Sequence, residues 1–221
     1  MKTLLLALFL CLLPLVLMAQ RVEVGLDAGP ALSYRLLQSS FKEYEEVLNA
    51  SERPLLGYRV GLDVVLRPQA KWQVGVGLLY NLRGFSNQVT FTDANNNPSE
   101  SRFAKQLHYL DVPVFVRYRF GGQEQQSFYA LAGVNNSFFL SDQFVAKEGP
   151  PDAQGGPREA FRPYNAGAMI GFGLRRQLSE KVSVEAGPLA SLQLQNAYKG
   201  DTPARRYLYT LGLNLRAAYR L

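Results

Sequence analysis

Apolar and polar residues alternate with a period of two along most of the chain. The clearest run is HYLDVPVFVRYRF, residues 108–120, where the apolar positions include Val112, Val114 and Val116. The positions between them include Asp111 and Arg117. Strict alternation of this kind predicts a β-strand with one apolar face and one polar face.

Eight segments show this alternation, and none shows a long helical period. Most of the eight are about 12 to 15 residues long, whereas a strand of a soluble protein has roughly five or six. A tilted strand of about 12 residues rises roughly 30 Å, the thickness of the hydrocarbon core of a bilayer. The segments are 21–35, 55–68, 71–85, 108–120, 127–140, 163–176, 181–195 and 207–221.

The connections between these segments alternate between short and long, as they do in outer-membrane barrels. Backbone groups in lipid must all be paired, so a membrane sheet has to close. The sequence therefore predicts an all-β fold: a closed antiparallel transmembrane β-barrel of about eight strands in an up-and-down meander. We expect the mature termini and the short turns to face the periplasm. The predicted long loops are 36–53, 86–105, 141–161 and 196–205.

The chain begins with MKTLLLALFLCLLPLVLMAQ, which has the features of a signal peptide. Lys2 precedes an apolar core that is too short for a stable membrane helix, and Ala19 is a plausible cleavage point. The predicted division is a cleaved signal peptide at 1–19 and an outer-membrane barrel domain at 20–221. Cys11 is the only cysteine, so the mature chain is expected to form no disulfide.

Charged residues on the predicted inner face are the best candidates for a functional site. They suit either a gated ion path or a salt-bridged plug, and the narrow interior of an eight-stranded barrel favours the plug. We expect Glu185, Arg216 and Glu23 to pair with one another. The predicted lumen charge cluster comprises Glu23, Asp27, Arg59, Asp63, Asp111, Arg117, Arg119, Glu185 and Arg216.

Other kinds of chemistry have weak support. The net charge is +6, but lysines and arginines form no basic run, so no nucleic-acid partner is predicted. His108 is the only histidine and no GxSxG motif is present, which argues against a hydrolase. DANNNPSE, residues 93–100, resembles the start of a calcium loop but has Pro98 where glycine is required. We therefore predict no catalytic residue, cofactor or metal.

Three stretches resemble the PorT-like family of small bacterial outer-membrane β-barrel proteins. YLDVPVFVRYRF is similar to that family's YL-acid-aliphatic-P strand, and LLYNLRGFS to its ElxYsxkGf strand, with Leu78 where an acid is common. GFGLRRQLSEKVSVEAGPLASL is similar to its late hairpin. The resemblance implies an integral outer-membrane barrel, tied in some members to protein secretion. The chain departs from the pattern at its end, where Leu221 replaces a terminal Phe.

The sequence thus favours a structural or interaction barrel with a largely plugged lumen. Its expected partners are outer-membrane lipid, the barrel-insertion machinery during assembly, and a protein bound through the long extracellular loops. A narrow porin-like channel for small solutes or ions is the first alternative. A lipid-modifying outer-membrane enzyme is the second.

Overall fold

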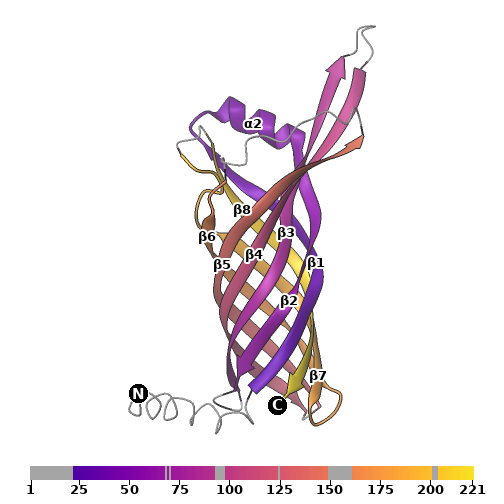
Figure 1. Ribbon diagram of the computed structural model, residues 1–221, viewed down its shortest axis with the longest axis vertical. Helices are drawn as coiled ribbons and strands as arrows, with labels where there is room; N and C mark the ends of the chain where they lie inside the picture. Colours follow the sequence, from indigo (N-terminus) through magenta and orange to yellow (C-terminus); the bar gives the residue numbers. More distant parts are fainter. Residues whose placement is uncertain are drawn as a thin grey trace, which may run out of the picture.

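The computed structural model describes residues 22–67, 69, 71–92, 98–123, 125–148, 161–200 and 204–221. Its eight strands follow one another in an antiparallel ring, and β1 pairs with both β2 and β8 to close it (Figure 1). The predicted all-β barrel is therefore confirmed. The predicted signal peptide lies outside the described residues. The strands are β1 (Val22–Ser39), β2 (Glu52–Leu66), β3 (Trp72–Thr92), β4 (Pro98–Gln123), β5 (Gln126–Glu148), β6 (Tyr164–Gln177), β7 (Val182–Gln193) and β8 (Ala204–Arg220).

Three strands are much longer than predicted. β3, β4 and β5 have 21, 26 and 23 residues and run beyond the rest of the barrel (Figure 1). The prediction of loops at 86–105 and 141–161 was wrong over much of both ranges. Residues 85–92 pair with 98–105, and 102–108 pair with 141–148, so backbone pairing continues where the apolar alternation fades. Residues 93–97, including most of the calcium-like stretch, lie outside the described residues.

The predicted loop at 36–53 also differs from the structure. It contains helix α2 (Lys42–Ser51), which lies at the same end of the barrel as the long strand extensions (Figure 1). Glutamates at 43 and 45 lie in its first turn, where a negative charge favours the helix dipole. Good helix formers therefore outweigh the absence of a long apolar stripe in this segment.

The two ends of the barrel differ in construction. At the turn end, the strands are joined by residues 67–71, 124–125 and 178–181, and both Val22 and Arg220 lie there. At the loop end lie α2 and the long extensions. Between the two ends, the β3–β4 pairing steps from Val76–Val114 to Leu79–Asp111 and so passes over Pro113, which has no N–H to donate.

The distribution of polarity is inverted relative to a soluble protein. Large apolar side chains such as Leu26 and Ile170 are 53% and 64% exposed, while Arg216 is 2% exposed. Aromatic side chains form contacts near both ends of the apolar band, which is where aromatic girdles meet the membrane interfaces. The contacts are Trp72–Tyr118, Tyr118–Phe120 and Phe120–Phe128 near the turn end, and Tyr58–Tyr80 and Phe138–Tyr164 toward the loop end.

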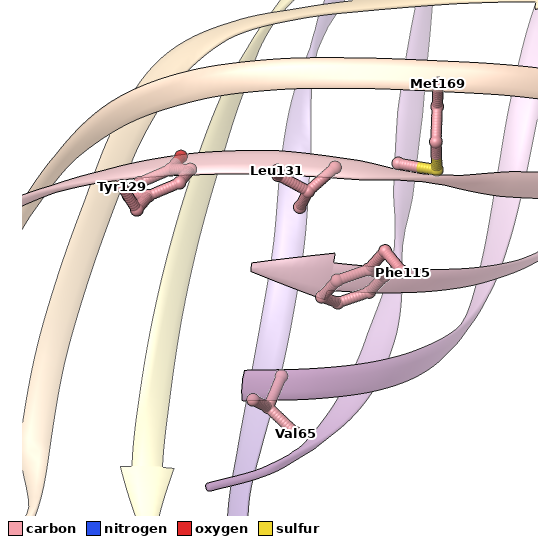
Figure 2. Packing of buried hydrophobic residues seen from close by; sticks show 5 residues of the cluster. All are labelled: Val65, Phe115, Tyr129, Leu131 and Met169. Carbon is pink, nitrogen blue, oxygen red and sulfur yellow. The ribbon is translucent and has the colours of Figure 1, made fainter. Parts of the chain in front are cut away.

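The interior also contains an apolar patch, which the sequence analysis did not identify. Its side chains come from strands around the barrel and lie inside the ring (Figure 2). Glycine makes room for one of them, because a Cβ at Gly75 would lie 2.4 Å from the Phe115 ring. The members are Val65, Phe115, Tyr129, Leu131 and Met169.

Candidate functional site in the barrel interior

A bidentate ion pair joins β8 and β2 across the interior. The Arg216 guanidinium donates from Nε and Nη2 to the Asp63 carboxylate, with distances of 2.7 to 3.0 Å. Strand β1 lies between these two strands, and its Gly25 allows the pair to meet. A Cβ there would lie 2.3 Å from Asp63 Oδ1 and 2.4 Å from Arg216 Nε. The Asp63–Arg216 pair crosses over Gly25 and therefore requires a residue without a side chain at this position.

Glu185 on β7 forms ion pairs with three guanidinium groups. Its carboxylate lies 2.8 Å from Arg117, 2.9 Å from Arg175 and 3.2 Å from Arg216. All four side chains are at most 2% exposed. The Arg117 guanidinium also lies over the Tyr129 ring, 4.9 Å from its centroid. Such a cluster offsets much of the cost of desolvating its charges, because each charge has several partners.

Asp27 has a looser environment than Asp63. Asn214 donates to its Oδ1 at 3.0 Å, and the nearest guanidinium nitrogens of Arg59 and Arg216 are both 3.9 Å away. Arg59 instead donates to the Asn214 side-chain oxygen at 2.7 Å. The side-chain amide of Asn214 therefore bridges the two residues: it donates to the Asp27 carboxylate and accepts from the Arg59 guanidinium.

Nearer the loop end, Asp111 forms a second buried cluster. Arg83 forms an ion pair with Asp111, and Asn81 and Asn135 each donate to the same carboxylate oxygen at 2.9 Å. Arg83 also donates to Ser137 Oγ at 3.2 Å. Five side chains from three neighbouring strands, β3, β4 and β5, thus fill the lumen at this level.

Glu23 is the acid nearest the turn end. Arg175 pairs with both of its oxygens at 2.5 and 2.8 Å, Arg67 also forms an ion pair with it, and Arg220 reaches it at 4.0 Å. Arg216 lies 3.9 Å away. Arg119 differs from the other arginines of the predicted cluster, since it donates to a hydroxyl, Ser127 Oγ at 3.3 Å.

An aromatic cluster occupies the loop end. It forms where residues 161–163 and 194–198 fold against the strands, joined by a bridge between Phe161 and Tyr198. Burial raises the pKa of the Tyr198 hydroxyl, and the Arg206 guanidinium lies 5.3 Å from the centroid of that ring. The buried members are Leu107, Tyr109, Phe161, Ala197 and Leu208.

A small cavity lies between these layers, bounded by residues including Arg59, Phe115, Arg117 and Met169, and has a volume of about 20 Å³. That is room for about one water molecule. The described interior therefore combines charged layers, an apolar patch and an aromatic cluster.

Several interior residues lie outside the predicted cluster, although the alternation could have identified them. Arg175 follows the outward Leu174 and so belongs to the inner face, yet it was not proposed. Arg83 alternates with the apolar positions Tyr80 and Leu82 and so also belongs to the inner face, but it is not among the predicted residues. The ion pairs of Glu52 with Arg35 and Arg206 were also missed, because Glu52 lies in a segment predicted to be a loop.

The remaining candidates for chemistry are His108 and possible metal ligands. His108 lies on the outer side of β4, where it hydrogen-bonds with Tyr80 and contacts its ring. The described residues contain no group of three or more His, Cys, Asp or Glu side chains that could hold a metal ion. No described helix is long and apolar enough to cross a membrane.

Residues 18–179 match the family described as outer membrane protein beta-barrel domain. The sequence matches no curated protein. Three similar solved structures are Neisserial surface protein A (13% identity, 90% of this chain and 97% of that chain, TM-score 0.48), OprG from Pseudomonas aeruginosa (12%, 89% and 96%, 0.44) and the outer membrane protease OmpT from Escherichia coli (10%, 92% and 97%, 0.48). Likenesses this distant carry no information on activity.

Proposed function

This chain belongs to the outer membrane protein beta-barrel domain family, and we propose that it is an interaction barrel with a closed lumen. In this proposal the barrel anchors the protein in the outer membrane, and the parts beyond the loop end bind a partner protein. We further infer that it is a PorT-like member of the family with a cleaved signal peptide. The observation that carries the proposal is the combination of a filled interior with long strands that extend past the ring.

The extension consists of residues 88–92 of β3, 98–105 of β4 and 140–148 of β5. The pairing of β2 with β3 ends at Glu52–Asn87, and that of β5 with β6 ends at Phe138–Tyr164. Both outer edges of the three-stranded extension thus run on past their neighbours in the ring. Backbone groups at such edges can pair with a strand from another protein, which supports a protein partner with an extended segment.

A narrow channel is the competing function, and conductance separates the two. We expect the purified protein in planar bilayers to show no steady ion current above that of the bare membrane, because charged and aromatic side chains fill the lumen at successive levels. A general porin reconstituted in parallel serves as the positive control. Reproducible single-channel steps from the wild-type protein would favour the channel.

The orientation and the partner are tested together with an impermeant, thiol-reactive photo-crosslinker on intact cells. Two cysteines are introduced separately into a Cys11→Ser background, at Val145 in the extension and at Ser179 in the β6–β7 turn; Val145 is 37% exposed. We expect Val145→Cys to react on intact cells and, after illumination, to yield one discrete protein adduct. Ser179→Cys should react only after the outer membrane is permeabilised.

The opposite labelling pattern would reverse the orientation and remove the extension from the cell surface. Labelling of Val145→Cys without a discrete adduct, in cells grown under several conditions, would count against the partner role. The two readouts are distinct, since labelling reports the side of the membrane and the adduct, which forms only after labelling, reports contact with a partner.

A further inference from the structure

Positive charge is unbalanced at the turn end of the barrel. Farther inside, four acids (Asp27, Asp63, Asp111 and Glu185) lie among four arginines (Arg59, Arg83, Arg117 and Arg216). At the turn end, Glu23 lies among four arginines, Arg67, Arg119, Arg175 and Arg220, and Arg175 also shares Glu185 with the inner group. These two groups of described lumen residues together contain eight arginines and five acids, and the excess of three positive charges lies toward the turn end.

These four arginines interact with one another. Arg67 lies within electrostatic range of Arg119, Arg175 and Arg220. Their side chains approach from the end of β2 and from β4, β6 and β8, and so from all around the ring. Because a guanidinium does not lose its proton in proteins, mutual repulsion cannot be relieved by deprotonation.

Hydrogen-bond donors at this end are also left without acceptors. The Nε atoms of all four arginines are buried and have no hydrogen-bond partner among the described residues, as is also the case for Arg59, Arg83 and Arg117 farther inside. Two fully buried side chains at the same end, Gln73 on β3 and Ser183 on β7, are likewise unpartnered. Buried donors without an acceptor are costly and rare in native structures, so they indicate a ligand with several acceptor oxygens.

We propose that the turn-end mouth of the barrel binds an oxyanion of the phosphate class. A phosphate group carries between one and two negative charges at neutral pH, and its several oxygens suit the forked donors of arginine. Arg220, whose side chain is 36% exposed, lies at the opening, while Arg175 is 2% exposed and lies deeper. The site is thus open to the solvent at the turn end. It does not depend on the extension or on a protein partner.

Inorganic phosphate is the first probe, titrated calorimetrically into the full protein in uncharged detergent with physiological NaCl. We expect saturable binding to a single site. Arg119→Gln should weaken it at least tenfold, and this arginine is chosen because it donates its hydrogen bond to the Ser127 hydroxyl, outside the Glu185 cluster. Glu23→Gln should strengthen binding severalfold, because it removes the carboxylate that competes for the same guanidiniums.

Arg176→Gln is the matched control, since Arg176 is exposed on the outer side of β6 at the same end. It removes the same charge and should leave the affinity within twofold of wild type. Short-chain phosphatidylglycerol in the same micelles is the second probe: binding of phosphate alone identifies a soluble ligand, and binding only of the lipid identifies a headgroup. No saturable binding of either probe, or equal losses in Arg119→Gln and Arg176→Gln, would overturn the proposal.

Discussion

Replacing Arg216 with methionine is expected to destabilise the barrel by about 3–5 kcal/mol, the usual cost of removing one partner from a buried ion pair. Arg216 is 2% exposed and lies between the carboxylates of Asp63 and Glu185. Methionine fills a similar length of the lumen without its charge. The loss therefore reports the stranded carboxylates more than a cavity.

The loss of Arg216 should be more costly for the Asp63 carboxylate than for the Glu185 carboxylate. Glu185 keeps Arg117 at 2.8 Å and Arg175 at 2.9 Å, whereas every guanidinium hydrogen bond to Asp63 in the described interior comes from Arg216. Adding Asp63→Asn to Arg216→Met should therefore recover more stability than adding Glu185→Gln. Contacting residues typically show coupling energies of about 0.5–3 kcal/mol, and we expect the Asp63 pair in the upper half of that range.

Two double-mutant cycles on urea unfolding in lipid vesicles measure this difference. Each cycle needs both single variants, so that any destabilisation by Asp63→Asn or Glu185→Gln alone is subtracted. Strict additivity in the Asp63 cycle would mean that this ion pair contributes no coupling. A larger rescue by Glu185→Gln would place the main partner of Arg216 on β7 instead of β2.

In the interior, the sequence could predict which residues face the lumen but not which of them pair. Alternation placed Glu23, Asp63, Glu185 and Arg216 on one face, because the side chains of a strand change sides at every residue. It could not supply the partners, since contacts across a lumen depend on the stagger between strands that are distant in the chain. Glu185, Arg216 and Glu23 were expected to pair, and Arg216 does lie 3.2 Å from Glu185 and 3.9 Å from Glu23. The alternation did not indicate that Arg216 is also bidentate with Asp63, or that Glu23 is held mainly by Arg175.

The loop end was harder to predict for a different reason. Inside the bilayer, lipid forces one face to be apolar, so the alternation is strong. Beyond the bilayer both faces of a strand can be polar, and the pattern is lost although backbone pairing continues, as it does from Phe85–Lys105 to Thr92–Pro98. The same polar composition concealed helix α2, whose sequence KEYEEVLNAS lacks a long apolar stripe.

Replacing Val114 with arginine is expected to cost about 2–4 kcal/mol of folding free energy, because arginine on the lipid face is most costly at the bilayer midplane. Val114 is 47% exposed on the outer side of β4. It pairs with Val76 on β3 and Val134 on β5, midway between the two groups of aromatic contacts. The change should lower the urea midpoint in vesicles and reduce the amount of assembled barrel in cells.

Val182→Arg is the matched control, since it makes the same substitution at another exposed valine. Val182 is the first residue of β7 at the turn end, opposite Tyr219. Near an interface, an arginine on the lipid face costs only about 0–1 kcal/mol, because its long side chain can reach the headgroups. A depth-dependent penalty is thus expected only if the apolar band contacts lipid. Equal losses at the two valines would mean that the bilayer midplane does not lie at Val114, and no loss at either would mean that the apolar face is not the lipid face.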